Sequence, residues 1–173
     1  MVPFPTLLPI QTERLVVRVY DVEDVARIHA ALYGDPAVRR WTGGPSTLTE
    51  TRAVIARYID AQRRDGYAYG AVVERGSSDL VGEAGLKPLD DVGPEIEVGY
   101  AFAVASQRRG YATEVARAIA ATAFGPMQLE RVYATAHPEN AGSRHVLAKL
   151  GFTSVPTPRT GNSDLLYHVL ERR

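Results

Sequence analysis

The chain has 173 residues, of which 45% are hydrophobic and 23% are charged, so it can bury a core without help from a metal or a disulfide. Its 20 basic residues balance its 20 acidic residues, and no overall positive field therefore points to a nucleic-acid partner. The sequence contains no cysteine, which excludes thiol nucleophiles, disulfides and thiolate metal sites.

The length and the absence of linkers and repeats predict one domain over residues 1–173. The first residues lack a basic region, and Pro3, Pro5 and Pro9 interrupt their apolar run, so they do not resemble a signal peptide. No stretch approaches the ~20 apolar residues of a membrane span. We therefore expect a cytoplasmic protein that does not associate with a membrane.

The first half of the chain alternates between β-branched stretches and helical periodicity. Asp21 is the expected N-cap of the first helix. Thr47 or Thr49 is the expected cap of the second helix, and Gly66 is its expected stop. The predicted order is a lead-in at 1–11, a strand at 14–20, a helix at 21–34, a loop at 38–47 and a helix at 48–66.

The second half predicts mostly strands, with two further helices. Gly99 lies inside an expected strand, where glycine indicates a bulge or a close backbone approach. Asn140 caps the last expected helix and Gly151 ends it. The predicted elements are strands at 67–74, 80–88 and 95–104, a helix at 107–124, a strand at 130–137, a helix at 140–150, and strands at 152–158 and 164–172. This order predicts an α/β protein with one mostly antiparallel sheet.

The segment QRRGYA, residues 107–112, opens an expected helix with two arginines. A helix N-terminus already carries about half a positive charge, so Arg108 and Arg109 are either exposed and mildly unfavourable or close to a bound anion. Gly110 and the small Ala112 would let an anion approach the free N–H groups. Neither a P-loop nor a dinucleotide fingerprint is present, so a pyrophosphate is the anion that fits best.

QRRGYA matches the Q/R-x-x-G-x-G/A pattern of the GNAT acyltransferase superfamily. Together with EIEVGYAF, LERVYATAHPENAGSRHVLAKLGF and QTERLVVRVYDVEDV, it resembles the branch of ribosomal-protein N-terminal acetyltransferases (RimJ/RimL-like), most specifically over residues 95–152. The resemblance implies a GNAT fold, in which a mixed, mostly antiparallel sheet of about seven strands splays between strands four and five and is flanked by about four helices.

The resemblance also implies the transfer of an acetyl group from acetyl-CoA to a primary amine of a small molecule or of a protein N-terminus, without a metal. Acetyl-CoA would lie between the strands at 95–104 and 130–136, with its pyrophosphate on backbone N–H groups. The expected cofactor-binding residues are Phe102, Val104, Gln107, Arg108, Arg109, Gly110, Tyr111, Ala112, Thr113, Asn140 and Ser143.

Three catalytic positions follow from the resemblance. Glu97 is the expected base, acting directly or through a water, and the backbone N–H of Val98 is the expected donor to the thioester carbonyl. Ser143 is the expected acid, because Leu147 stands where many members carry a tyrosine. The alternatives are an exposed strand carboxylate at Glu97 and ordinary helix-start chemistry at Asn140 and Ser143.

The expected acceptor-binding residues are Trp41, Tyr69, Glu83 and Glu97, and Trp41 alternatively fills the core. The sequence does not identify the amine, which could belong to a protein N-terminus, an amino acid, a polyamine or an antibiotic. The alternative function is a non-catalytic acyl-CoA-binding sensor or interaction module, favoured by the absence of a hydroxyl at Leu147. A homodimer is also compatible with the resemblance.

Overall fold

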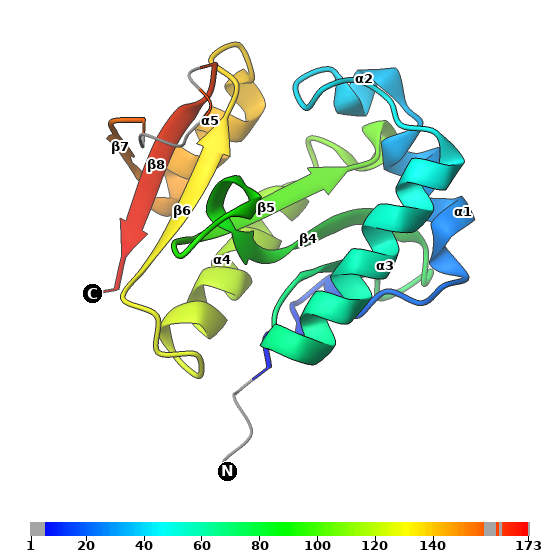
Figure 1. The fold of residues 1–173 in the computed structure, drawn as a ribbon, viewed down its shortest axis with the longest axis horizontal. Helices are drawn as coiled ribbons and strands as arrows, with labels where there is room; N and C mark the ends of the chain where they lie inside the picture. Colours follow the sequence, from blue (N-terminus) through cyan, green and yellow to red (C-terminus); the bar gives the residue numbers. More distant parts are fainter. Residues whose placement is uncertain (1–5, 158–161, 163, 173) are drawn as a thin grey trace.

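The computed structural model describes residues 6–157, 162 and 164–172. Its described residues form an eight-stranded sheet in the order β1-β2-β3-β4-β5-β6-β8-β7, shown in Figure 1. Neighbouring strands are antiparallel except for β5 and β6, which are parallel. The strands are β1 (Ile10–Gln11), β2 (Leu15–Arg18), β3 (Tyr69–Glu74), β4 (Leu80–Pro88), β5 (Ile96–Phe102), β6 (Arg131–Ala136), β7 (Thr153–Val155) and β8 (Leu166–Glu171).

Helices cover both faces of this sheet (Figure 1). On one face, α1 and α3 pack against a small cluster of buried hydrophobic residues. On the other face, α4 and α5 pack against a larger hydrophobic cluster. The helices are α1 (Asp24–Ile28), α2 (Pro36–Arg39), α3 (Leu48–Asp65), α4 (Tyr111–Phe124) and α5 (Ala141–Leu150), with single turns at His29–Tyr33, Leu89–Asp91 and Val104–Ser106.

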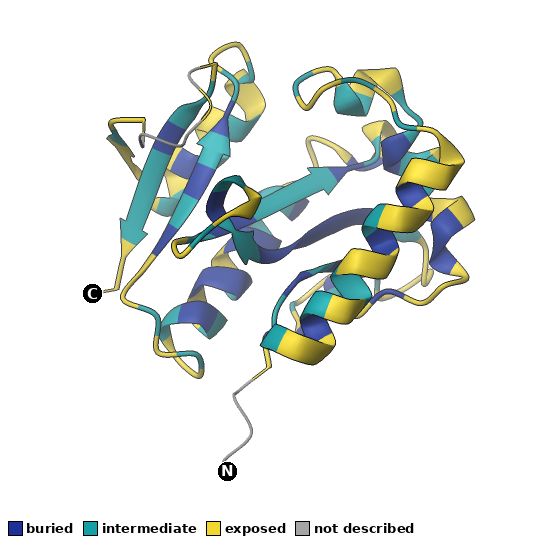
Figure 2. Cartoon of the chain, in the orientation of Figure 1, coloured by how far each residue is buried: buried dark blue, intermediate teal, exposed yellow. Residues whose placement is uncertain are grey.

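The central strand β4 has a covered face on each side of the sheet. Its side chains alternate between the faces, so that Ala84 and Leu86 join the cluster under α4 and Glu83 points to the face of α1 and α3, where it contacts tyrosines. Figure 2 shows that β4 is buried along most of its length while the outer side of α3 is exposed. The α3 face of β4 and β5 therefore carries polar groups that are shielded from bulk water.

The sheet opens between β5 and β6. The register pairs only Glu97 with Tyr133, and beyond this point the two strands diverge in Figure 1. This is the splay that was expected between predicted strands four and five. These two strands are β5 and β6 in the structure, because the short edge strand β1 was not predicted. The expected fold class is therefore confirmed, with one more strand and one more helix than the sequence predicted.

Several expected helix ends are confirmed. Thr47 caps α3 through a capping box with Glu50, and Asn140 caps α5 by accepting a hydrogen bond from the Ser143 N–H. Gly66 and Gly151 end these helices in the left-handed conformation, which glycine adopts without a steric penalty.

The expectations for Asp21 and for the strand at 95–104 were wrong. α1 begins at Asp24, and its N-cap residue is Glu23 rather than Asp21. The Asp21 side chain accepts a hydrogen bond from the Glu23 N–H at 3.1 Å just before the helix, and its backbone N–H donates to the Asp24 carboxylate at 2.8 Å. The helix gives way to a π-turn after Ile28. The strand at 95–104 ends at Phe102 and pairs with β4 in continuous register, without a bulge. Residues 1–5 of the expected lead-in and residue 158 of the expected strand at 152–158 lie outside the described residues.

The helix expected from residue 107 begins instead at Tyr111. Arg108 and Gly110 both have positive φ values, 60° and 81°, and a chain with this geometry does not continue an α-helix. The two arginines therefore precede the helix and lie in the loop that leads into it.

Candidate active site

A cavity of about 900 Å³ lies where β5 and β6 separate. Side chains from α3, the central strands and the start of α5 line it, so it extends from one face of the sheet to the other. Seven of the residues that the sequence singled out meet in its lining, namely Trp41, Tyr69, Glu83, Glu97, Val98, Asn140 and Ser143.

Glu97 is a buried carboxylate, with 7% of its surface exposed. Burial raises the pKa of Glu97, the nearby Lys87 ammonium opposes that shift, and Asp91 adds to it. The Lys87 Nζ lies 3.6 Å from Oε1 of Glu97. The alternative of an exposed strand carboxylate is therefore wrong, and the group has the raised pKa that a base near neutral pH requires.

Tyr69 reaches Glu97 across Gly99. A Cβ atom on Gly99 would lie 1.7 Å from the Tyr69 hydroxyl oxygen, so no other residue fits there without moving the tyrosine. The hydroxyl donates to Oε1 of Glu97 at 3.4 Å, a long hydrogen bond. The group that approaches Gly99 closely is thus the Tyr69 side chain rather than the backbone that was expected, and it brings a phenol beside the buried carboxylate.

A second hydroxyl pair lies on the α5 side of the cavity. The Ser143 Oγ is 3.3 Å from the Tyr100 hydroxyl oxygen, and both side chains line the cavity. Burial raises the pKa of Tyr100 to about 12. Leu147, one turn after Ser143, is 1% exposed and offers only methyl groups. Sequence analysis missed Tyr100, because strand alternation alone does not show which phenol meets a distant helix.

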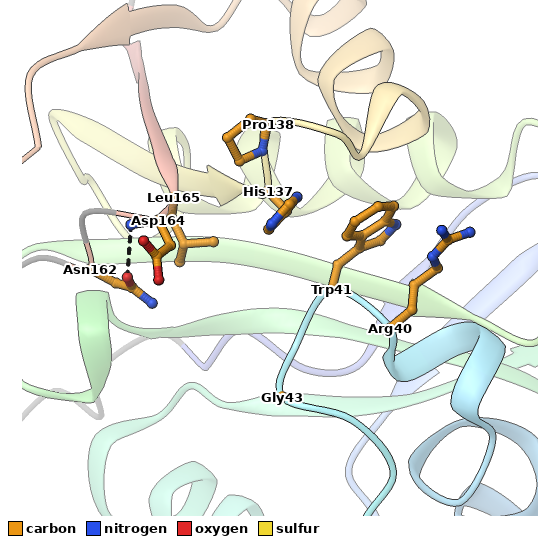
Figure 3. A pocket seen from close by; sticks show the side chains of 8 residues that line it. All are labelled: Arg40, Trp41, Gly43, His137, Pro138, Asn162, Asp164 and Leu165. Atoms are coloured by element: carbon orange, nitrogen blue, oxygen red, sulfur yellow. Dashed lines mark hydrogen bonds between the residues drawn. The ribbon is translucent and has the colours of Figure 1, made fainter.

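Trp41 lines the cavity and also a smaller pocket of about 590 Å³, which Figure 3 shows with Arg40, His137 and Leu165. Its ring stacks on His137 with the centroids 4.6 Å apart, and the guanidinium of Arg40 lies 4.3 Å from the Trp41 ring centroid. The stack joins the loop after α2 to the end of β6. His137 ends the strand that was expected at 130–137, and nothing in the local sequence indicates this contact.

The loop before α4 has the geometry of an anion site. Thr47 and Asn140 cap α3 and α5 with side-chain hydrogen bonds, whereas α4 has no side-chain cap. Gly110 and Arg108 combine positive φ values with exposed positions. Free N–H groups at a helix N-terminus, preceded by backbone in this conformation, form a concave donor surface for phosphate groups.

The side chains of this loop differ from the expectation. Arg109 forms an ion pair with Glu74 at 2.8 Å and lies 4.6 Å from the centroid of the Tyr111 ring. Tyr111 is buried and hydrogen-bonds to the same Glu74, and Gln107 donates to the Phe102 carbonyl oxygen at 3.0 Å. These three side chains are thus held by the protein. The Gln107 backbone N–H is also engaged, because it donates to the Val104 carbonyl oxygen at 3.2 Å.

The remaining expected residues also lie near this loop. Thr113 is buried at the start of α4 and Ala112 is half-buried. Val104 belongs to a single turn after β5 and is 52% exposed, so it does not continue the strand as expected. Arg108 takes part in none of the ion pairs among the described residues.

The described residues show no sign of a metal site or of a membrane-spanning helix. The described part of the chain contains no cluster of three or more histidine, aspartate or glutamate side chains that could hold a metal ion. No helix within those residues combines the length and the apolar character needed to cross a membrane.

Comparison with known proteins identifies the family. The family model of the acetyltransferase (GNAT) domain, which describes the sequences of that family, matches residues 14–153. The chain therefore belongs to the GNAT acetyltransferase family. It is an acetyltransferase whose acetyl donor is acetyl-CoA.

Individual relatives agree with this assignment. The N-acetyltransferase YoaA of Bacillus subtilis, itself uncharacterized, is 26% identical over 151 residues, which are 86% of this chain and 83% of YoaA. An acetyltransferase from Agrobacterium tumefaciens has a similar structure, with a TM-score of 0.84, 25% identity and 95% of each chain covered. RimL, an α-N-protein acetyltransferase of ribosomal L7/L12 solved with coenzyme A, shares the fold, with a TM-score of 0.79 and 15% identity over 95% of this chain and 98% of RimL. The expected family is confirmed, and the likeness to RimL shows the fold alone.

Proposed function

We propose that this protein transfers the acetyl group of acetyl-CoA to a primary amine of a small molecule or of a protein N-terminus. The observation that carries the proposal is the buried carboxylate of Glu97, which lines the cavity beside the single register pair between β5 and β6. An amine is protonated at neutral pH and cannot attack a thioester until it loses that proton. A buried carboxylate with a raised pKa is the group suited to accept it.

In this proposal Glu97 is the general base, acting directly or through one water. Tyr69 orients the carboxylate through its hydrogen bond to Oε1. Lys87 keeps a fraction of Glu97 ionised, because its ammonium opposes the effect of burial on the carboxylate pKa. Glu97 would therefore be ionised when an acceptor enters and would hold a proton after the amine has attacked.

Ser143 is the proposed donor toward the departing sulfur. The Tyr100 hydroxyl lies within reach of Ser143 Oγ, so it can supply a hydrogen bond to the serine while the serine hydroxyl points into the cavity. A phenol with a raised pKa stays protonated at neutral pH and so keeps one O–H group that can donate. Tyr100 would thus act through Ser143, as a positioning residue.

The acetyl donor supplies an activated acyl group on a thiol leaving group. The backbone N–H of Val98 is the proposed contact for the thioester oxygen, because Val98 lines the cavity beside Glu97. The proposed contacts for the pyrophosphate are the backbone N–H groups from Arg108 through Thr113. Trp41 is proposed to border the acceptor, as part of the lining of the same cavity.

The test is an acetyl-transfer assay with a panel of primary amines, which reads both free thiol and the mass of the product. The expected result is release of one coenzyme A for each N-acetylated amine, and loss of most turnover in Glu97→Gln. Glu95→Gln is the matched control, because Glu95 is exposed two residues earlier on the same segment. Full activity of Glu97→Gln would disprove the assignment of the base, and acetylation of hydroxyl acceptors only would disprove amine transfer.

A further inference from the structure

Glu83 is a second buried carboxylate in the same cavity. It is 4% exposed, and the hydroxyls of Tyr20 and Tyr33 both donate to its Oε2, at 2.9 and 2.8 Å. Of the described residues, none hydrogen-bonds to Oε1, and the ion pairs among them do not include Glu83. Glu83 is therefore a shielded carboxyl group that forms no ion pair among the described residues. Burial raises its pKa, and the charges of Arg39 and Lys87 oppose that shift.

Glu83 and Glu97 lie at two ends of the acceptor side of the cavity. Glu83 is opposite Ala101 and Glu97 is opposite Lys87 in the register of β4 and β5, so four register positions, or about 13 Å along the strands, separate them. Both side chains point to the α3 face, because each is hydrogen-bonded by tyrosines on that face. An elongated molecule on this face would meet a carboxylate at each end.

Aromatic rings occupy the wall between the two carboxylates. Tyr33, Tyr58 and Tyr69 line the cavity, and the rings of Tyr58 and Tyr69 are 5.3 Å apart between centroids. The faces of aromatic rings attract cations, and their edges pack against methylene groups. This wall is suited to an alkyl chain that carries positive charge.

The lysine and arginine side chains that line the cavity are Lys87, Arg64, Arg39 and Arg57, and of these the first two form ion pairs among the described residues. Lys87 contacts Asp91 and Glu97, and Arg64 pairs with Asp65. Arg39 lies 5.0 Å from the Tyr33 ring centroid and donates through Nη2 to the Thr42 carbonyl oxygen, although its Nε is buried without a partner among the described residues.

We propose that Glu83 binds a second cationic group of the acceptor, so that the preferred acceptors are alkyl diamines or longer polyamines. This inference rests on the proposed amine transfer. The reacting amine lies at the Glu97 end, and the second ammonium group takes the free oxygen of Glu83. The spacing of the two carboxylates fits an ammonium-to-ammonium distance on the order of 10 Å.

The experiment compares three acceptors of matched chain length, namely hexamethylenediamine, hexylamine and ε-aminocaproate. They place an ammonium, a methyl and a carboxylate at the end remote from the reacting amine. The wild-type protein is expected to give a kcat/KM for the diamine about tenfold or more above that for hexylamine, with ε-aminocaproate the poorest. Because this ranking is measured on the wild-type protein, it tests the proposal even if a Glu83 variant does not fold.

The variant Glu83→Gln is expected to lower the ratio of kcat/KM between diamine and hexylamine by about tenfold, while Glu95→Gln keeps the wild-type ratio. Equal kcat/KM for diamine and hexylamine, or an unchanged ratio in folded Glu83→Gln, would show that Glu83 only holds Tyr20 and Tyr33 against the sheet. A preference for ε-aminocaproate would assign the subsite to Arg39 and overturn the proposal.

Failure of the proposed function is distinguished by a binding measurement. If no amine is acetylated, calorimetry with hexamethylenediamine and the coenzyme A-bound protein still reports on Glu83. Binding that Glu83→Gln weakens would support the cation subsite while disproving amine transfer. Absence of diamine binding to the wild-type protein would overturn the subsite as well.

Discussion

The Lys87 Nζ lies 3.6 Å from Oε1 of Glu97 and 2.8 Å from Oδ1 of Asp91. Lys87 is opposite Glu97 in the register of β4 and β5, and Asp91 lies in the turn after β4, so the contact follows from strand pairing and one turn. The ammonium stabilises the ionised form of Glu97 against burial. Lys87 therefore controls how readily the proposed base is available.

Replacing this lysine should shift the pH dependence of activity. Because Lys87 lowers the pKa of Glu97, Lys87→Met is expected to raise that pKa, and the acid limb of the kcat/KM profile should move to higher pH. Activity at low pH falls first, since the base must be ionised. The control is Lys149→Met, which removes the only other lysine, exposed on α5. An acid limb that stays in place or moves to lower pH would contradict the role of Lys87.

The proposed anion site before α4 can be tested with two side chains of the same shape that differ in charge. Gly110 has φ of 81°, a conformation that Asn and Asp tolerate better than other side chains. Gly110→Asp is expected to weaken coenzyme A binding by about tenfold or more relative to Gly110→Asn, because a carboxylate repels the pyrophosphate. Calorimetry with coenzyme A measures both variants. Equal affinities would mean that the pyrophosphate does not lie near this loop.

The hydroxyl pair of Tyr100 and Ser143 predicts a change in turnover. Tyr100→Phe keeps the ring and removes the hydroxyl that lies 3.3 Å from Ser143 Oγ. We expect kcat to fall by about tenfold while the dissociation constant of coenzyme A changes little. Tyr133→Phe is the matched control, since Tyr133 is on β6 and is not among the residues that line the cavity. A purely structural role of Tyr100 would instead lower the melting temperature and leave kcat of the folded protein unchanged.

The capping box of α3 predicts a change in stability. Thr47 accepts a hydrogen bond from the Glu50 N–H at 3.2 Å, and Thr47→Ala leaves this N–H without its cap. The free energy of unfolding is expected to fall by about 1 kcal/mol, measured by denaturant titration. Thr49→Ala changes an exposed residue inside the same turn and should have a smaller effect. The opposite ranking would mean that Thr49 is the cap.

The local sequence correctly predicted those helix ends that are set by a capping residue or by a glycine stop. Gly66, Gly151 and Asn140 were assigned correctly because a left-handed stop or a side-chain cap depends on residues within one turn. The start of α4 was misplaced because the backbone reversal at Arg108 and Gly110 has no hydrophobic signature. That the whole chain is one domain stays a prediction.

One motif and the family resemblance also predicted most of the candidate site from the sequence. The sequence indicated Glu97 and Ser143 but not Tyr100, Lys87 or His137. These residues come from different elements, and a contact between them depends on strand register and helix packing, which local patterns do not encode. Their roles in catalysis remain proposals.

The sequence by itself determined the family, the acetyl donor and the order of strands and helices, because a phosphate-binding loop and helix caps are made by neighbouring residues. Only the tertiary structure decided which side chains share the cavity. The partial separation of β5 from β6 opens it, and the register of β4 against β5 places Glu83 and Glu97 on one face about 13 Å apart. Burial then raises the pKa of both carboxylates, a property that neither residue has in an unfolded chain.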